Sequence, residues 1–344
     1  MGLEHTIVRY RDLKPCKSAF IDTHTPGSDR KDNFTIIGPG VSENPDQHIH
    51  IRKTPGFNIG AAGQPPGCRN SLHAHRTAEV FFVLEGRWRF FWGRRGDAGE
   101  AVLGEGDIFD IPTGIFRGFE NIGADYGMIM SILGGNDAGG GVIWAPEVIE
   151  EAARHGMILG ENGVVYDRTQ GQSLPPDIEP MPRLSDEALN GFPEPATEDI
   201  VRFYVARYND LLRRGDEGAS PVKVIGEYAL IRDRPGFEVD FLARSGASDE
   251  AFVHESPAVL MPLRGRWQVE IGDDRASLDA GDTMLIESGA LYRLTAAGEG
   301  EAGLYRVVGT KDAAGPTWTA WRKAAQDTPP NANAGMDDDP PKSR

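Results

Sequence analysis

Two histidines and one glutamate form the clearest group of potential metal ligands in the chain. His73 and His75 lie two positions apart, and Glu79 follows four positions later. Because residues i and i+2 of a β-strand point to the same face, both imidazoles would share a face that Glu79 can reach from the same strand or the next. Two imidazoles and one carboxylate suit Fe(II), and also Mn, Ni, Co or Zn. We therefore expect a divalent-metal site at these three residues.

Short apolar segments bounded by turn residues surround these ligands. Residues 80–84 are apolar and end at Glu-Gly, residues 88–92 are rich in aromatics, and residues 108–111 precede Pro-Thr-Gly. Short segments of this kind, with turns about every ten residues, are typical of β-sandwiches and barrels. We therefore expect an all-β fold whose short strands position the ligands.

An internal repeat divides the chain into two similar parts. Residues 86–93, which begin Gly-Arg-Trp, recur as residues 265–272, and residues 106–114, which begin Gly-Asp, recur as residues 281–289. The offsets are 179 and 175 residues, and the order is preserved. A repeat of this length predicts two copies of one domain, with small deletions in loops.

The first copy resembles the cupin superfamily. The first cupin motif is matched at every spacing, and the second is matched except at its histidine, where this chain has Arg117. The matching residues are Gly67, His73, His75, Glu79 and Gly86 in the first motif and Gly106, Pro112, Gly114 and Asn121 in the second. The resemblance implies a bicupin, with two antiparallel jelly-roll barrels in tandem and a metal inside a barrel. As a two-domain protein, the chain is similar to cupin-type dioxygenases such as gentisate and quercetin dioxygenases.

Arg117 changes the ligand set that the resemblance implies. Arginine stays protonated and cannot bind a metal, so three ligands remain. Three ligands leave open positions for O2, water and a bidentate substrate. Arg117 would then act as a catalytic residue that pairs with a substrate carboxylate or enolate. In the alternative interpretation Arg117 points out of the barrel mouth and the metal site is decaying.

The second copy has lost most of the ligand types. Alignment of Gly265 with Gly86 places Phe252, His254 and Ala258 at the three ligand positions. Tyr292 takes the position of Arg117. We therefore expect no metal in the C-terminal cupin, which would cover the first barrel or form a dimer interface.

Other side chains are candidates for contact with a substrate. A polar pair would lie at the barrel mouth, and aromatic residues at strand spacing would form an apolar pocket. For each aromatic residue the alternative is packing in the core. The predicted substrate-binding residues are Arg69, Asn70, Phe81, Trp88 and Phe90.

A second histidine pair, His48 and His50, also shares one strand face. These two residues either supply the missing metal ligand or lie on a surface or edge strand. Cys68 lies five residues before His73 and is expected to be a packing residue without chemistry.

The expected domain organisation follows from the repeat and from local composition. An apolar stripe at helical spacing marks residues 197–214, which we expect to dock on a barrel. The predicted parts are an N-terminal arm (1–50), an N-terminal cupin barrel with the metal site (51–140), a linker with short helices (141–220), a degenerate C-terminal cupin barrel (221–322) and a disordered tail (323–344).

Composition excludes several classes of partner. The 344 residues carry 36 Lys and Arg against 52 Asp and Glu, a formal net charge of −16, which disfavours nucleic acids and anionic lipid surfaces. No apolar segment has transmembrane length. Cys16 and Cys68 cannot form a disulfide scaffold or a cysteine zinc site. We expect a cytoplasmic protein.

The sequence thus favours a metal-dependent bicupin oxidoreductase. Our first hypothesis is a non-heme Fe(II) dioxygenase that binds an aromatic or enolic small molecule in the N-terminal barrel. The alternatives are a Mn, Zn or Ni cupin isomerase, decarboxylase or hydrolase, and a non-catalytic small-molecule-binding cupin. The resemblance also implies a homodimer.

Overall fold

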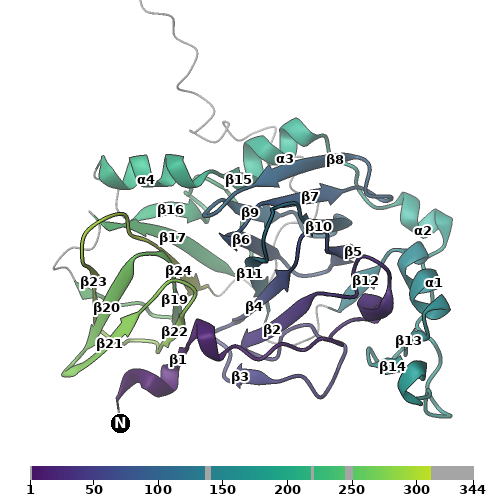
Figure 1. Cartoon of the computed structure of the whole chain (residues 1–344). Coiled ribbons are helices and arrows are strands. Elements are labelled where there is room, and N and C mark those ends of the chain that lie inside the picture. Colours follow the sequence, from purple (N-terminus) through teal and green to yellow (C-terminus); the bar gives the residue numbers. More distant parts are fainter. Residues whose placement is uncertain (1, 136–140, 218–220, 245–250, 311–344) are drawn as a thin grey trace, which may run out of the picture.

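The computed structural model describes residues 2–135, 141–217, 221–244 and 251–310. Most of the regular structure is antiparallel β-sheet, arranged in two similar halves (Figure 1). The expected all-β class, with two antiparallel units in tandem and a short helical linker, is confirmed.

The N-terminal half has two sheets that carry the three predicted metal ligands. Within the described residues, a seven-stranded sheet contains, in spatial order, β15 (Val205–Ala206), β9 (Ile108–Ile111), β6 (Glu79–Glu85), β11 (Gly127–Gly134), β4 (Phe57–Gln64), β2 (Asp32–Ile37) and β3 (Ile49–Ile51). A five-stranded sheet contains β12 (Val142–Trp144), β5 (Arg69–His75), β10 (Arg117–Asn121), β7 (Trp88–Trp92) and β8 (Gly99–Leu103).

The C-terminal half repeats this arrangement. Among the described residues, a six-stranded sheet contains β1 (Ile7–Val8), β22 (Thr283–Ile286), β19 (Ala258–Arg264), β24 (Gly303–Gly309), β17 (Phe237–Ala243) and β16 (Val222–Ile225). A four-stranded sheet contains β18 (Ala251–Phe252), β23 (Tyr292–Ala297), β20 (Arg266–Ile271) and β21 (Asp274–Leu278).

The remaining elements lie mainly in the linker. A small two-stranded sheet pairs β13 (Met157–Leu159) with β14 (Val165–Asp167). The helices are α1 (Pro146–Arg154), α2 (Asp186–Asn190), α3 (Thr197–Tyr204) and α4 (Tyr208–Asp216). Proline at the first position of α1 fits that position because it has no N–H to satisfy. None of the helices in the described ranges is both long and apolar enough to span a bilayer.

Aromatic side chains fill the space between the two sheets of the N-terminal half. The Phe81 ring of β6 contacts Phe90 of β7 and Phe119 of β10, with centroid distances of 5.5 and 5.1 Å. The next residue, Phe82, points away from this core and meets Tyr305 of β24 at 4.9 Å. Strand β6 is therefore buried on both faces, which explains its continuous apolar sequence.

The two halves exchange edge strands. Strand β1, from the start of the chain, pairs with β22 of the C-terminal half. Strand β15, which directly follows α3, pairs with β9 of the N-terminal half. The dark N-terminal segment in Figure 1 therefore lies beside the C-terminal sheet. The segment 197–214, expected to be one helix, is interrupted at β15 because these residues complete a sheet.

The predicted N-terminal arm is likewise part of the folded body. Strands β2 and β3 extend the seven-stranded sheet beside β4. Pairing with β4 buries residues 34–37, whose backbone groups would otherwise be unpaired. The predicted disordered tail, residues 323–344, lies outside the described residues.

Candidate metal centre

The three predicted ligands converge inside the N-terminal half. His73 and His75 project from β5, and Glu79 is the first residue of β6. One potential ligand atom from each lies within 4.8 Å of the others. All three side chains are buried, with at most 5% of their surface exposed. The alternation of β5 therefore produces the shared face that the His-x-His spacing predicts.

Hydrogen bonds and burial prepare the imidazoles for a metal. Nδ1 of His73 donates to the Ser71 carbonyl oxygen at 2.7 Å, which leaves its Nε2 available. Desolvation, and then the nearby Arg117 charge, hold the pKa of His73 and of His75 well below the ordinary value. Both rings are therefore neutral at physiological pH, which is the form that binds metals.

A divalent metal fits these residues. Neutral imidazole nitrogens and a carboxylate oxygen are ordinary ligands of Fe, Mn, Co, Ni and Zn ions. His73, His75 and Glu79 present two such nitrogens and one such oxygen from a buried pair of strands. The donor set does not determine which of these metals is bound.

Arg117 points into the same interior. It lies directly opposite His73 in the pairing of β5 with β10, and 2% of its surface is exposed. Its guanidinium donates to Glu79 Oε2 and, at 3.4 Å, to the His73 carbonyl oxygen. The alternative that Arg117 points out of the barrel mouth is therefore wrong. Arg117 acts here as the counter-ion of Glu79, and its contact with a substrate stays a prediction.

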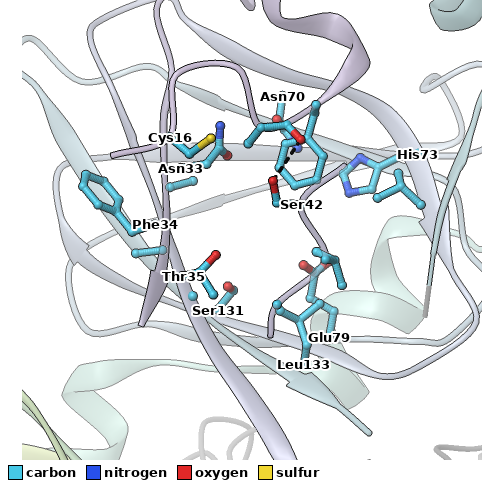
Figure 2. Close-up of a pocket in the computed structure, with 18 of the residues that line it drawn as sticks. Cys16, Asn33, Phe34, Thr35, Ser42, Asn70, His73, Glu79, Ser131 and Leu133 are labelled. Atoms are coloured by element: carbon cyan, nitrogen blue, oxygen red, sulfur yellow. Dashed lines mark hydrogen bonds between the residues drawn. The ribbon is translucent and has the colours of Figure 1, made fainter. Parts of the chain in front are cut away.

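A small cavity adjoins the predicted ligands. Its volume is about 60 Å³, and its wall includes His73, His75 and Glu79. Figure 2 shows His73 at one end, with Cys16, Asn33 and Phe34 at the other. Much of the wall comes from the N-terminal segment, namely residues 16–20, 33–35 and 40–47. This segment therefore forms part of the site.

The predicted substrate-binding residues divide into two groups. Asn70 and Phe81 line the cavity. Trp88 and Phe90 do not, because they are fully buried between the sheets, as in the core-packing alternative. Arg69 also does not reach the cavity. It is exposed at the start of β5 and borders a separate surface cleft, so its predicted place at the barrel mouth is wrong.

A β-bulge explains why Asn70 faces the cavity. Simple alternation would place Asn70 and His73 on opposite faces of β5. The register of β5 against β10 shifts by one residue, so that Arg117 opposes His73 while Phe119 opposes Asn70. Because Arg117 and Phe119 share a face, Asn70 and His73 do so as well.

Two further residues support His73 and were not predicted. The Trp144 ring lies 5.4 Å from the His73 ring, and its Nε1 donates to Glu43 Oε1 at 2.6 Å. Glu43 Oε2 also accepts from the Ile21 backbone N–H at 2.7 Å. Burial raises the pKa of Glu43 to about 8. The hydrogen bond between Trp144 and Glu43 joins residues 101 positions apart, and no sequence spacing links them.

The other histidine pair lies away from the metal centre. His48 precedes β3 and His50 lies in it, at the edge of the seven-stranded sheet, and their rings pack against each other. His50 Nδ1 donates to the Thr35 carbonyl oxygen at 2.9 Å. The edge-strand interpretation is therefore confirmed. Cys68 is fully buried, as expected for a packing residue.

The equivalent region of the C-terminal half is occupied by other side chains. Phe252 opposes Tyr292, just as His73 opposes Arg117, so the structure confirms the alignment of the two copies. His254 Nε2 lies 2.9 Å from the Tyr292 hydroxyl. Arg306 Nη2 donates to Asp240 at 2.5 Å, and 2% of Arg306 is exposed. A buried ion pair thus fills this interior.

Comparisons with known proteins agree with this architecture. Residues 63–133 match the cupin domain model. A germin-like protein 3-8 from Oryza sativa subsp. japonica is 32% identical over 106 residues, a match that covers 27% of this chain and 47% of that protein. The chain thus spans about half the length of this curated relative.

Solved structures show the same fold at low sequence identity. The Lactobacillus farciminis oxalate decarboxylase formate complex matches with a TM-score of 0.54 and 12% identity, over 94% of this chain and 90% of that chain. A single-site variant of the B. subtilis oxalate decarboxylase gives a TM-score of 0.51 and 13% identity, over 94% and 84%. Residues 63–133 of this chain are thus similar to a cupin domain, and its two halves together have the same fold as these solved two-domain structures.

Proposed function

We propose that the N-terminal cupin is a divalent-metal-dependent enzyme that acts on a small enolic or carboxylic molecule. The observation that carries this proposal is the convergence of His73, His75 and Glu79 within 4.8 Å on the wall of a cavity. When bound, the metal would supply Lewis acidity and open positions for a substrate and for O2 or water. The protein would act as a homodimer in the cytoplasm.

The protein side chains would hold and orient the reacting groups. His73 is fixed by Ser71 and Trp144, and Glu79 is fixed by Arg117. Such supporting contacts orient metal ligands and tune their basicity. The aromatic residues Phe81 and Phe119 complete a wall that limits the access of water.

Cavity size favours a small substrate over an aromatic one. The cavity measures about 60 Å³. A protein cavity that binds benzene measures about 150 Å³. An aromatic substrate would therefore require residues 16–20 or 40–47 to move, whereas an acid of a few heavy atoms requires much less change.

The ligand set favours oxygenation at Fe(II) as the first candidate reaction. Two histidines and one carboxylate with open positions are the pattern of non-heme Fe(II) oxygenases. The second candidate is redox-neutral decarboxylation on Mn(II), which the small cavity favours because a short carboxylic acid fits it. Two proteins with the same fold are named as oxalate decarboxylases, which is compatible with this candidate.

Elemental analysis of the purified protein tests the metal site. We expect about one equivalent of a transition metal in the wild type and its loss in His73→Ala/Glu79→Ala. The matched control is His48→Ala/His50→Ala, which also removes two imidazoles but outside the site, and it should keep the metal. A wild type that holds no metal after reconstitution with Fe(II) or Mn(II) contradicts the proposal.

Gas measurements then separate the two reactions. Oxygen uptake with small enolic acids supports oxygenation, and CO2 release from short carboxylic acids without net oxygen uptake supports decarboxylation. Metal-dependent binding of these acids without turnover would instead indicate a non-catalytic binding protein.

A further inference from the structure

A cleft on the outer face of the five-stranded sheet is separate from the metal centre. Its volume is about 360 Å³, and its wall includes Leu72 of β5 and Val148 of α1. Leu72 directly precedes His73, so strand alternation places these two side chains on opposite faces of β5. A ligand in this cleft would therefore lie behind the strand that carries the histidines, in a space of the size that small-molecule sites have.

Two arginines in the cleft have no partner for their charge. Arg69, at the start of β5, and Arg95, after β7, are exposed and line the cleft. In the described part of the chain, neither guanidinium forms an ion pair or a hydrogen bond. Arginine binds phosphate oxygens through pairs of N–H donors, and a phosphate monoester carries a charge of about −1.5 to −2 at neutral pH. The two guanidiniums therefore fit one phosphate group.

A buried hydroxyl in the same wall also lacks a partner. Thr25 lines the cleft with 6% of its surface exposed, and its Oγ1 has no hydrogen bond within the described ranges. A buried hydroxyl without a partner is costly, so an acceptor oxygen on a ligand would stabilise it. Thr25 is thus a further donor, beside the two arginines, for the oxygens of a phosphate group.

An apolar surface adjoins these donors. It consists of Leu72, Phe91 and Val148, of which the first and last are buried and Phe91 is half-buried. Apolar ligand area that covers such a surface is removed from water, which favours binding. A ligand that fills the cleft therefore has an apolar part beside its phosphate.

Two carboxylates of α1 complete the wall, Glu147 and Glu151. Glu151 is already paired with Arg154, and its Oε1 lies 3.0 Å from His155 Nε2. The Glu147 carboxylate has no such partner among the residues that the structure describes. Acidic side chains accept hydrogen bonds from the ribose hydroxyls of bound nucleotides. The wall therefore offers acceptors for a sugar, donors for a phosphate and apolar surface for a base.

We propose that this cleft binds a nucleoside monophosphate, with its phosphate on Arg69 and Arg95 and its ribose hydroxyls on Glu147. The site goes beyond the proposed function and does not depend on the metal. The net charge of −16 does not prevent such binding, because exposed charges more than about 8 Å away are largely screened at physiological ionic strength.

Calorimetric titration of the full-length protein with AMP tests this site. Adenosine lacks the phosphate and ribose 5-phosphate lacks the base, and we expect AMP to bind at least about tenfold more tightly than either. The same titration of His73→Ala/Glu79→Ala should give the wild-type dissociation constant for AMP. Equal affinity there would exclude AMP bound at the metal centre.

A double variant tests the two arginines. Arg69→Met/Arg95→Met removes both unpaired charges and keeps similar apolar bulk, so the dissociation constant for AMP should rise at least about tenfold. The matched control is Arg52→Met/Arg87→Met, which removes two exposed positive charges outside the cleft. It should leave AMP binding unchanged.

The variant Thr25→Val separates binding from stability. Valine has nearly the shape of threonine but no hydroxyl, so AMP should bind about threefold or more weakly. Because the lost hydroxyl has no partner in the described ranges, the unfolding midpoint without AMP should equal or exceed that of the wild type. A purely structural role for Thr25 would instead lower the midpoint and leave AMP affinity unchanged.

The outcomes separate this inference from the proposed function. Adenosine or ribose 5-phosphate that binds as tightly as AMP overturns the inference, and so does wild-type affinity in Arg69→Met/Arg95→Met. Loss of AMP binding in His73→Ala/Glu79→Ala overturns it as well, because the nucleotide would then bind at the metal centre. Protein that binds AMP but no metal supports the inference and contradicts the metal-dependent enzyme, and protein that binds metal but not AMP does the reverse.

Discussion

At the scale of single residues, Arg117 brings a charge to the position where the cupin motif has its last histidine. It donates to Glu79 and lies across from His73, so it supports the ligands from behind the cavity wall. In the metal-free protein it also neutralises a carboxylate that is 5% exposed. Arg117 therefore stabilises the buried Glu79 carboxylate without a metal.

Replacement of Arg117 by Met should destabilise the metal-free protein. Removing one partner of a buried ion pair costs about 3–5 kcal/mol, because the other charge is left unpaired. Thermal unfolding should show a clearly lower midpoint for Arg117→Met, and added Mn(II) should restore part of the loss. Arg69→Met, on the same sheet but exposed, is the control. Equal midpoints for the wild type and Arg117→Met would rule out a stabilising ion pair.

Glu43 should make stability depend on pH. Its pKa is raised to about 8 from an ordinary 4.5, because desolvation outweighs the hydrogen bonds from Trp144 and the Ile21 N–H, which lower the pKa. The folded protein therefore keeps a proton that the unfolded chain releases, and this stabilisation, complete below pH 4.5, is lost as pH rises toward 8. The loss amounts to roughly 5 kcal/mol.

Comparison with Glu43→Gln isolates this contribution. Glutamine keeps one acceptor for Trp144 or Ile21 but cannot ionise, so the variant should be less stable than the wild type at pH 5 and nearly equal or more stable at pH 9. Unfolding midpoints measured across this range provide the check. Parallel pH profiles for the two proteins would exclude titration of Glu43.

The candidate metal ligands could be predicted from the sequence, but the residues around them could not. The spacing of His73, His75 and Glu79 is local, and strand alternation converts it directly into geometry. Asn70 faces the cavity only because of a bulge, and Trp144 reaches His73 through pairing of β12 with β5. Arg69 was misplaced because no local pattern separates an exposed strand start from a barrel mouth.

At the scale of elements, the exchanged strands carry matching contacts. Arg9 Nη1 donates to Asp282 Oδ2 at 2.8 Å, and the Tyr10 N–H donates to Oδ1 of the same residue at 2.9 Å. In the other half, Arg207 and the Tyr208 N–H bind Asp107 at 2.7 and 3.0 Å. An Arg-Tyr pair therefore follows each exchanged strand and fastens it.

A glycine beside each aspartate makes room for the tyrosine. Gly106 and Gly281 have φ angles of +85° and +84°. A Cβ atom at Gly106 would lie 2.4 Å from the Tyr208 ring, and one at Gly281 would lie 2.7 Å from the Tyr10 ring. The Gly-Asp pair that recurs in the sequence thus marks the place where an Arg-Tyr pair is bound in each half. The two Arg-Tyr pairs are too short to be recognised as a repeat from the sequence.

Replacing either aspartate should weaken the pairing of the exchanged strand that the aspartate holds in place. Charge-assisted hydrogen bonds contribute about 1.5–3 kcal/mol, so Asp282→Asn should raise hydrogen exchange in β1 and Asp107→Asn should raise it in β15. Each variant serves as the control for the other. Increased exchange spread evenly over both strands in either variant would contradict local fastening.

At the scale of the whole molecule, the seven-stranded sheet of the N-terminal half packs against the six-stranded sheet of the C-terminal half. The sequence patterns did not predict which side chains form this contact. Phe82 meets Tyr305, Phe57 meets Phe237 at 5.5 Å, and the Tyr305 hydroxyl donates to the Gly106 carbonyl oxygen at 2.6 Å. The repeat predicted two domains. However, β6 is apolar on both faces, so its sequence does not show which face packs against the C-terminal half. The relative placement of the halves therefore needed the structure.

A carboxyl pair lies within this contact between the halves. Asp110 of β9 is fully buried and faces Asp233 of the C-terminal half, with Tyr204 of α3 nearby. Desolvation, and then the proximity of Asp233, raise the pKa of Asp110 well above its ordinary value. A shared proton between the two carboxyl groups is the arrangement that avoids placing two buried negative charges together.

Asp110→Asn should therefore stabilise the protein most at high pH. A raised pKa means that the folded state loses stability as pH rises and the shared proton is released. Asparagine keeps a donor for Asp233 and cannot ionise, so the unfolding midpoint of the variant should exceed that of the wild type more at pH 8.5 than at pH 5. Asp186→Asn, at the exposed start of α2, is the control. A variant less stable than the wild type at pH 8.5 would contradict proton sharing.

The exchange of edge strands also sets an order of events during synthesis. Strand β15 leaves the ribosome soon after the sheet that it completes, whereas β1 pairs with a strand made about 275 residues later. At about 5–20 residues per second, the first strand to be made stays without its partner for roughly 14–55 s. During that interval the nascent chain exposes an unpaired strand, so the pairing of β1 with β22 has to follow the synthesis of both halves up to β22.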